Sequence, residues 1–271
     1  MSSSKGERHI LSLSGGKDSS ALAIYMKNRV PAMEYVFCDT EKELPETYEY
    51  LGKLEAFLGQ PIRRLKHEEG LGFDALLTIR RGYLPSPQAR WCTDYLKIKP
   101  FEKYVGDDIV TSYVGIRADE PHRRGYISTK PNIKARFPFV EDNIRKQDVL
   151  RILQESGLGI PSYYQWRSRS GCYFCFFQQR REWVGLLETH PELYQASLGY
   201  EKTDPVTGER YTWIQNESLA DLAKPDRIER IKEQYQRRLE RERSVSPNSS
   251  LSDVFGDETD SGSGGCLVCH L

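Results

Sequence analysis

The sequence has no apolar run of 18 or more residues and no signal-peptide-like hydrophobic segment near its start. We therefore expect no transmembrane helix and a cytoplasmic location. Its 39 basic residues are balanced by 39 acidic ones, so net charge points to no particular class of partner. No internal repeat is present. A chain of 271 residues is long enough to bury a full hydrophobic core.

Two common phosphate-binding patterns are also missing. The chain contains neither the Walker pattern G-x-x-x-x-G-K-[ST] nor the dinucleotide pattern G-x-G-x-x-G. It has instead S-G-G-K-D-S at residues 14–19, between the apolar stretch 10–13 and a helical apolar pattern. This order predicts a buried strand, a glycine turn and a helix N-terminus. Main-chain N–H groups and the positive end of the helix dipole would then face an anion.

The residue types in this turn suit phosphate. Gly15 and Gly16 let the backbone approach phosphate oxygens without a Cβ atom in the way. The hydroxyls of Ser14 and Ser19 can donate hydrogen bonds, and Lys17 adds a positive charge. The alternative is a serine- and glycine-rich turn that binds no ligand.

The pattern S-G-G-K-D-S resembles the pyrophosphate loop of the PP-loop ATP pyrophosphatases. This resemblance implies that ATP binds with Mg²⁺ and that its β- and γ-phosphates lie on the loop while the α-phosphate is attacked. It also implies catalytic roles for Lys17 and Asp18.

The strand–helix–strand order at the start predicts an α/β fold with a parallel sheet. Predicted strands cover residues 10–13, 32–37, 62–65 and 109–114. We expect a doubly wound, mainly parallel sheet flanked by helices, of the adenine nucleotide α-hydrolase kind. The predicted divisions are a nucleotide-binding domain over 1–190, a helical extension over 191–243 and a flexible tail over 244–271.

Asp39 follows the second predicted strand, at the sheet edge where ligands gather. Its carboxylate is a candidate for binding Mg²⁺ or the ribose, and a helix N-cap is the alternative. Asp39 also begins D-T-x-x-x-x-P-E-T-Y, which resembles an element of the phosphoadenylyl-sulfate (PAPS) reductase branch of the same superfamily. The pattern W-C-T-x-x-L-K-x-x-P from Trp91 resembles the same branch.

A third motif, G-x-R-x-x-E, begins at Gly115, although Pro121 stands where this family usually has serine. Together the motifs extend the resemblance over residues 9–190. It implies that Lys97 lies near the nucleotide and that Arg117 binds phosphate and is catalytic. Arg117 follows a predicted strand, where a guanidinium can bind phosphate with two hydrogen bonds. Further candidates are Lys99, Arg123 and Arg124.

The cysteines are expected to be thiols or metal ligands rather than disulfides. Cys172 and Cys175 form a C-x-x-C pair, and Cys92 lies in the tryptophan motif. Related sulfur-transfer enzymes of the PP-loop class use three cysteines to bind a [4Fe–4S] cluster with one open iron. This resemblance implies that Cys92, Cys172 and Cys175 bind such a cluster here. A Zn²⁺ site with a fourth ligand and a metal-free thiol pair are the alternatives.

Three other cysteines have separate interpretations. Cys38 ends a predicted strand and is expected to be a small buried apolar residue. Cys266 and Cys269 lie in the tail, and their roles could be sulfur relay, cluster ligation or reduction.

The motifs favour an ATP pyrophosphatase that adenylates an acceptor oxygen so that sulfur can replace it. The chain most resembles the ATP-pyrophosphatase component of bacterial DNA phosphorothioation systems. That resemblance implies a cysteine desulfurase, DNA and other DNA-modification proteins as partners. The sequence leaves the oligomeric state open, and a homodimer is one alternative. The alternatives are a PAPS or adenylyl-sulfate reductase, a tRNA thiolation enzyme and a nucleotide-binding regulatory subunit.

Overall fold

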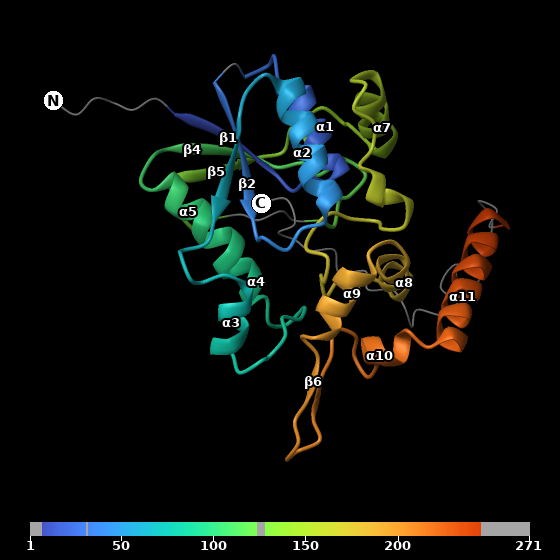
Figure 1. Cartoon of the computed structure of the whole chain (residues 1–271). Coiled ribbons are helices and arrows are strands. Elements are labelled where there is room, and N and C mark those ends of the chain that lie inside the picture. Colours follow the sequence, from blue (N-terminus) through green and yellow to red (C-terminus); the bar gives the residue numbers. More distant parts are fainter. Residues whose placement is uncertain (1–6, 31, 124–127, 245–271) are drawn as a thin grey trace. The chain divides into compact units, whose positions relative to one another are not determined.

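The computed structural model describes residues 7–30, 32–123 and 128–244 (Figure 1). Arg124 and the tail cysteines Cys266 and Cys269 lie outside this range. The described residues form two compact units, the first made of 7–80 and 89–172 and the second of 81–88 and 173–244. The first unit therefore ends before the boundary at residue 190 that we expected from the sequence.

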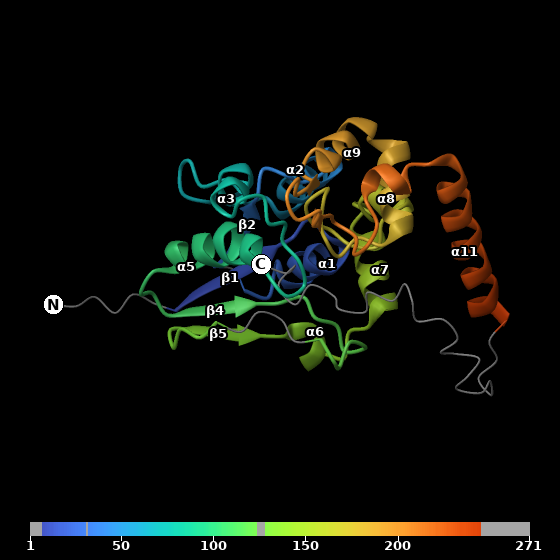
Figure 2. The ribbon, with the colours of Figure 1, turned by 90° about the horizontal axis from the view of Figure 1, so that it is seen from below.

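The first unit contains a five-stranded sheet in which every strand pair is parallel. Its strands are β1 (Arg8–Leu13), β2 (Met33–Asp39), β3 (Ile62–Lys66), β4 (Val110–Tyr113) and β5 (Ile133–Arg136). Their spatial order is β3-β2-β1-β4-β5, so the chain starts in the middle and builds outward in both directions. Figure 2 shows β4 and β5 running beside β1 in the same direction. The predicted doubly wound parallel sheet is confirmed.

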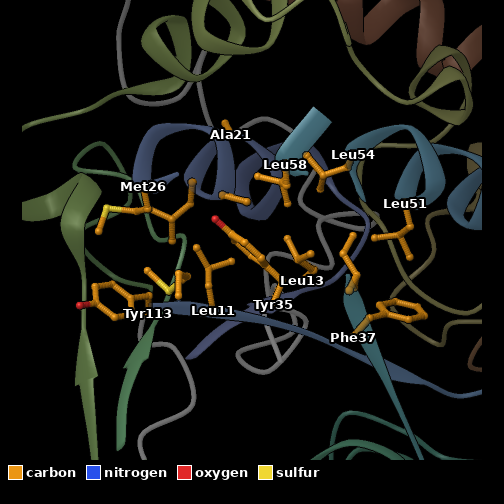
Figure 3. Close-up of a cluster of buried hydrophobic side chains, with 14 of the residues drawn as sticks. Leu11, Leu13, Ala21, Met26, Tyr35, Phe37, Leu51, Leu54, Leu58 and Tyr113 are labelled. Carbon is orange, nitrogen blue, oxygen red and sulfur yellow. The ribbon is translucent and has the colours of Figure 1, made fainter. Parts of the chain in front are cut away.

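Helices cover both faces of this sheet because its strands are apolar on both sides. Leu11 and Leu13 of β1 pack on one face, together with residues of α1 (Lys17–Met26), α2 (Pro45–Leu58) and α7 (Lys146–Glu155). Figure 3 shows this cluster. The opposite face of β1 contributes Ile10, which packs with residues of α5 (Lys99–Val105). β1 is thus buried at the centre of a three-layer α/β/α unit.

The remaining helices of the first unit are short. They are α3 (Phe73–Ile79), α6 (Pro138–Glu141) and the 3₁₀ turn η2 (Ser162–Gln165). α4 (Trp91–Thr93) continues through a π-helical turn, η1 (Asp94–Ile98), directly into α5. π-helical turns often occur at functional sites. Here the turn contains Leu96 and Lys97 of the tryptophan motif.

The second unit contains α8 (Arg180–Thr189), α9 (Pro191–Leu198), α10 (Leu219–Leu222), α11 (Pro225–Ser244) and a hairpin of β6 (Lys202–Thr203) and β7 (Arg210–Tyr211). Trp213 lies at its aromatic centre, stacked on Phe174 with ring centroids 5.1 Å apart. The Trp213 indole N–H donates to the Ser197 carbonyl at 2.8 Å. This bond satisfies the buried polar atom of the ring.

An apolar stripe runs along α11. Ile231 is buried, and Ile228, Tyr235 and Leu239 are partly buried. The Arg181 guanidinium of α8 lies 4.5 Å from the centre of the Tyr235 ring. The stripe therefore faces α8. Most charged residues of α11 are exposed, whereas Arg227 is partly buried and pairs with Glu217 at 2.5 Å. None of the helices in the described part of the chain is both long and apolar enough to span a membrane.

Candidate functional site

The candidate site lies where the sheet order changes direction. β1 and β4 are neighbours, but the chain leaves β1 toward β2 and leaves β4 toward β5. In sheets of this type ligands bind outside the carboxyl ends of the strands at such a point. The turn after β1 holds Ser14 to Gly16, and the turn after β4 holds Gly115 to Arg117. A Cβ atom added at Gly115 would lie 3.2 Å from the Asp18 main chain, so the two turns touch.

The two glycines of the first turn make room for protein atoms. Gly15 has a φ of 70°, and a Cβ atom there would lie 2.5 Å from the Thr47 methyl group of α2. A Cβ atom at Gly16 would lie 2.7 Å from the Ser170 hydroxyl and 3.1 Å from the Tyr164 hydroxyl. The sequence interpretation assigned this room to phosphate. The structure shows that other segments of the chain already occupy it.

The serine hydroxyls of the turn form a chain of hydrogen bonds. Ser170 donates to Ser14 at 3.1 Å, and the Ser14 and Ser19 hydroxyl oxygens are 3.1 Å apart. Ser19 donates to the Gly16 carbonyl at 3.2 Å. The two predicted phosphate donors therefore stabilise the turn through each other.

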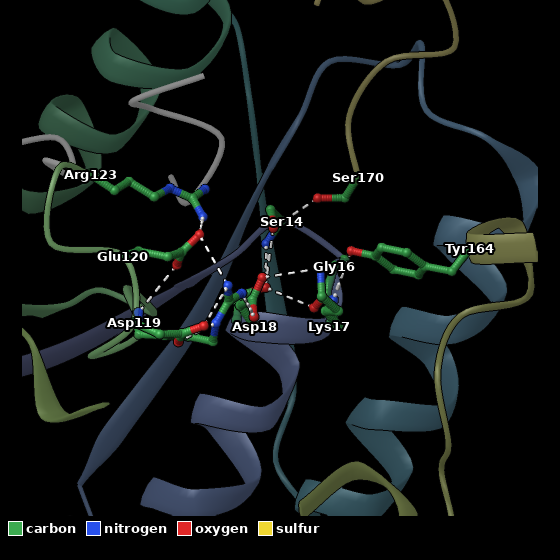
Figure 4. Close-up of polar contacts among 12 residues, drawn as sticks. Ser14, Gly16, Lys17, Asp18, Asp119, Glu120, Arg123, Tyr164 and Ser170 are labelled. Atoms are coloured by element: carbon green, nitrogen blue, oxygen red, sulfur yellow. Dashed lines mark hydrogen bonds and ion pairs between the residues drawn. The ribbon is translucent and has the colours of Figure 1, made fainter. Parts of the chain in front are cut away.

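The charged residues of the site meet at Asp18, which is 6% exposed at the N-terminus of α1 (Figure 4). Arg117 Nη1 lies 2.8 Å from one of its carboxylate oxygens, and Lys17 Nζ lies 3.5 Å from the other. The structure thus brings together all three predicted catalytic residues. One carboxylate offsets the repulsion between the two cations.

Two further carboxylates hold Arg117. Its Nε lies 2.9 Å from Asp119, and its Nη2 lies 3.4 Å from Glu120. Burial opposes the charged guanidinium, but the charge of Asp18 and the hydrogen bond to Asp119 outweigh burial and raise the pKa of Arg117. Burial also opposes the charged form of Asp119, but the hydrogen bond from Arg117 lowers its pKa. Arg123 joins the network at 2.8 Å from Glu120.

Asp39 lies at the carboxyl end of β2 and is 4% exposed. One of its oxygens accepts from the Glu41 N–H at 2.9 Å and from the Tyr48 hydroxyl at 2.7 Å. Burial and the bond to Asp39 raise the pKa of Tyr48. Asp39 does not cap α2, whose N-cap residue is Leu44. The structure thus shows Asp39 fixing the turn between β2 and α2.

Lys97 lies on η1 beside the end of β2. Its carbonyl accepts from the Cys38 thiol at 3.5 Å. Burial raises the pKa of Cys38 to about 12, although the nearby Lys97 charge opposes this rise. Cys38 is 1% exposed, which confirms its prediction as a buried residue. Lys99 is exposed, with its ammonium 3.6 Å from the centre of the Tyr95 ring.

The three cysteines that we predicted as cluster ligands are not all in one unit. Cys92 lies on α4 and is partly exposed, and the Cys172 thiol lies 3.2 Å from the Thr40 hydroxyl and 3.7 Å from Glu43 Oε1. Cys175 belongs to the second unit. Over residues 7–30, 32–123 and 128–244, no three His, Cys, Asp or Glu side chains are grouped to hold a metal ion. The three-cysteine centre stays a prediction.

Sequence reasoning missed a segment that packs on the glycine turn, residues 161–171, which we call the strap. The Tyr163 hydroxyl donates to the Gly15 carbonyl at 2.8 Å. The Lys17 main-chain N–H donates to the Tyr164 hydroxyl at 3.2 Å, and the Lys17 ammonium lies 4.8 Å from the centre of the same ring. Because these contacts join residues almost 150 positions apart, no local sequence signal could have revealed them.

Sequence reasoning also missed Glu43. It is 6% exposed, and its Oε1 accepts from the Thr40 hydroxyl at 2.9 Å. Its Oε2 has no hydrogen-bond partner within the part of the chain that the structure describes. Glu43 occupies one of the variable positions of the D-T-x-x-x-x-P-E-T-Y motif, so the motif did not identify it as a candidate site residue.

Comparisons with known proteins agree with the fold of the first unit. The family model described as the phosphoadenosine phosphosulfate reductase domain matches residues 8–176, more than half of the chain. The crystal structure of phosphoadenylyl-sulfate (PAPS) reductase from Candida auris, a phosphate complex, matches with a TM-score of 0.50 and 13% identity. This match covers 62% of the present chain and 82% of that chain, and it supports the fold alone.

Two relatives are similar in sequence. An uncharacterised protein of Methanocaldococcus jannaschii is 26% identical over 199 residues, which cover 69% of this chain and 40% of that protein. An uncharacterised nin region protein of Escherichia phage lambda is 27% identical over 209 residues, covering 66% of this chain and 68% of that protein. The chain thus spans less than half of the first relative.

We expect Gly15→Ala to destabilise the first unit through both strain and a clash. The left-handed backbone costs about 1–2 kcal/mol for alanine, and the contact with the Thr47 methyl adds about 1–3 kcal/mol of overpacking. Gly59→Ala is the matched control, since Gly59 has a φ of 68° and open space around it. Thermal unfolding midpoints measure both, and an equal loss in the two variants would contradict the clash.

We expect Arg117→Gln to lower the free energy of unfolding at pH 7 by about 2–3 kcal/mol, because charged hydrogen bonds are lost. Arg117 lowers the pKa of Asp119, so its stabilising effect is present above the ordinary carboxyl pKa and disappears as pH falls through the folded value. The difference between wild type and variant should therefore shrink below about pH 4. Denaturant unfolding at several pH values tests this, with the exposed-pair variant Arg29→Gln as control; a constant difference would contradict it.

Proposed function

Because the chain belongs to the phosphoadenosine phosphosulfate reductase domain family, we propose that it is an ATP pyrophosphatase that prepares an acceptor for sulfur incorporation. Membership of this family supports an enzyme that acts on nucleotides in sulfur chemistry. The more specific proposal rests chiefly on one observation. The intact S-G-G-K-D-S turn lies at the N-terminus of α1, and Lys17 and Arg117 share the buried carboxylate of Asp18.

The turn suits the β- and γ-phosphates of ATP. Gly16 has no side chain to cap α1, and the N-terminus of a helix attracts anions. Lys17 and Arg117 add two cations beside this N-terminus. Their charge would offset the negative charge that grows on pyrophosphate as it leaves, which lowers the barrier to its departure.

The proposed reaction has two steps. In the first, an acceptor oxygen attacks the α-phosphorus of ATP, so that AMP is transferred to the acceptor and pyrophosphate leaves. In the second, sulfide attacks the acceptor atom, and AMP leaves with the acceptor oxygen. If a persulfide attacks instead, the acceptor is left in a mixed disulfide with the sulfur carrier, and a second thiol must reduce that S–S bond to release the product. No side chain is assigned here as a general base.

Mg²⁺ would accompany ATP and neutralise phosphate charge. This ion prefers oxygen ligands and usually takes one or two carboxylates besides phosphate oxygens. Asp18 lies at the N-terminus of α1 and Asp39 at the carboxyl end of β2, and these two carboxylates are the oxygen ligands that we propose for the ion. Asp18 is already paired with Lys17 and Arg117, so Mg²⁺ would have to share its carboxylate with these cations.

The acceptor that we favour is a phosphate of the DNA backbone, because the motifs resemble the corresponding component of bacterial DNA phosphorothioation systems. A cysteine desulfurase would then supply sulfur, and other DNA-modification proteins would be partners. The proposal includes the [4Fe–4S] cluster on Cys92, Cys172 and Cys175, with Zn²⁺ as the alternative.

A second candidate function is reduction of PAPS or adenylyl sulfate. The match to the family model and the fold of the Candida auris enzyme favour it as much as the first. The two functions differ in the bond that breaks. The pyrophosphatase cleaves ATP into AMP and pyrophosphate, whereas the reductase releases sulfite from a nucleotide sulfate.

Product analysis separates the two functions. We expect the anaerobically purified protein to convert Mg·ATP to AMP and pyrophosphate, with faster turnover when DNA is present. Chromatography of the nucleotides and a pyrophosphate assay measure this. Sulfite release from PAPS with a thiol reductant, without ATP cleavage, would instead establish the reductase.

Lys17→Ala should lower ATP cleavage by about 100-fold or more, since a group that stabilises transition-state charge is lost. Lys27→Ala is the matched control, because Lys27 follows the same helix at its other end and donates to the Phe57 carbonyl. Steady-state rates of both variants test the assignment. Similar rates for Lys17→Ala and wild type would remove Lys17 from the catalytic residues.

Cys92→Ser tests the predicted cluster independently of activity. We expect the variant, purified without oxygen, to lose most of its iron and acid-labile sulfide, because one thiolate ligand is replaced by a poor one. Cys38→Ala is the control and should keep both, since Cys38 is not a predicted ligand. Full iron and sulfide content in Cys92→Ser would show that Cys92 is not a ligand.

A further inference from the structure

The strap makes hydrogen bonds with the same part of the turn that a phosphate group would use. The Lys17 main-chain N–H belongs to the first residue of α1, so it is one of the donors that a helix N-terminus offers to an anion. In the structure it donates to the Tyr164 hydroxyl at 3.2 Å. The Tyr164 oxygen thus has the place of a phosphate oxygen at this donor.

Ser170 contacts the turn in the opposite sense, as a donor. Its hydroxyl donates to the Ser14 oxygen at 3.1 Å, so it occupies space beside Ser14 that a phosphate oxygen would need, and Ser170 itself is 6% exposed. The absence of a Cβ atom at Gly16 allows both strap hydroxyls to come this close. Figure 4 shows Tyr164 and Ser170 pointing toward the turn from one segment of the chain.

We propose that Tyr164 and Ser170 belong to the phosphate site as exchangeable partners, and that a bound phosphate chain displaces their hydroxyls from Lys17 and Ser14. This inference rests on the proposed role of the turn in binding phosphate. It assigns to the strap a competitive role in ligand binding. The ligand class is a pyrophosphate group, either free or at the end of a nucleotide.

The exchange is favourable for physical reasons. Burial raises the pKa of Tyr164, so its hydroxyl stays neutral and is an ordinary acceptor for the Lys17 N–H. A phosphate oxygen carries charge, and charge-assisted hydrogen bonds are roughly twice as strong as neutral ones. The Tyr163 hydroxyl donates to the Gly15 carbonyl. A phosphate anion accepts hydrogen bonds, so it cannot replace this donor. The strap would therefore be released at Tyr164 and Ser170 while Tyr163 still anchors it.

Binding of Mg²⁺ and inorganic pyrophosphate to the full chain tests the exchange, with calorimetry as the measurement. Tyr164→Phe and Ser170→Ala should each bind pyrophosphate about 2- to 10-fold more tightly than wild type, because one competing hydrogen bond is gone. Tyr25→Phe is the matched control and should be unchanged, since its hydroxyl donates to Asp142. Weaker or unchanged binding by both strap variants would overturn the inference.

Hydrogen exchange gives a second readout that does not depend on a variant folding. In the wild-type chain, pyrophosphate should slow exchange in residues 14–20 and speed it in the strap. Slower exchange in both segments would mean that the strap closes on the ligand, and it would overturn the inference.

These outcomes are separable from those that test the proposed function. Tighter pyrophosphate binding by the variants without any ATP cleavage would support the strap inference and refute the pyrophosphatase. ATP cleavage by wild type, with no gain in pyrophosphate binding by the variants, would support the pyrophosphatase and refute the strap inference. If wild type binds no pyrophosphate, measurable binding by the Tyr164→Phe/Ser170→Ala double variant supports the inference, and none by either protein overturns it.

Discussion

The close approach of three chain segments at two consecutive glycines holds the candidate site together. At Gly15 the methyl group of Thr47 occupies the position of a side chain, and at Gly16 the strap does so. The turn is therefore packed from both sides by its own protein. Its donors are arranged before any ligand arrives, which reduces the ordering cost of binding. The same packing explains why a turn of small residues keeps one conformation.

Charge is arranged around the same turn by one buried carboxylate. Lys17 and Arg117 each pair with one oxygen of the Asp18 carboxylate. Asp18 lies in the first turn of α1 and Arg117 in the turn after β4, so this ion pair joins α1 to that turn at the point where the sheet order reverses. Asp119 and Glu120 further neutralise Arg117. A phosphate ligand must therefore compete with carboxylates for this guanidinium.

The sequence predicted most of the first unit because its elements follow local patterns. The apolar stretch before Ser14 and the helical spacing after it were sufficient to predict β1 and α1. β5 (Ile133–Arg136) was missed because its four residues alternate between buried and exposed positions too briefly to identify a strand. The resemblance named Lys17, Asp18 and Arg117, and the structure brings them together.

Other features of the site could not have been predicted, because they depend on distant contacts. Tyr164 and Ser170 look like ordinary polar residues until the fold places them on Gly16. The sequence predicted that Asp39 binds Mg²⁺ or the ribose, but its hydrogen bonds to Glu41 and Tyr48 are visible only in the fold. The strap also ends next to Cys172, whose carbonyl is held by the buried Arg167 guanidinium at 2.8 Å. Arg167 belongs to the strap, so one segment of the chain contacts both the glycine turn and the backbone at Cys172.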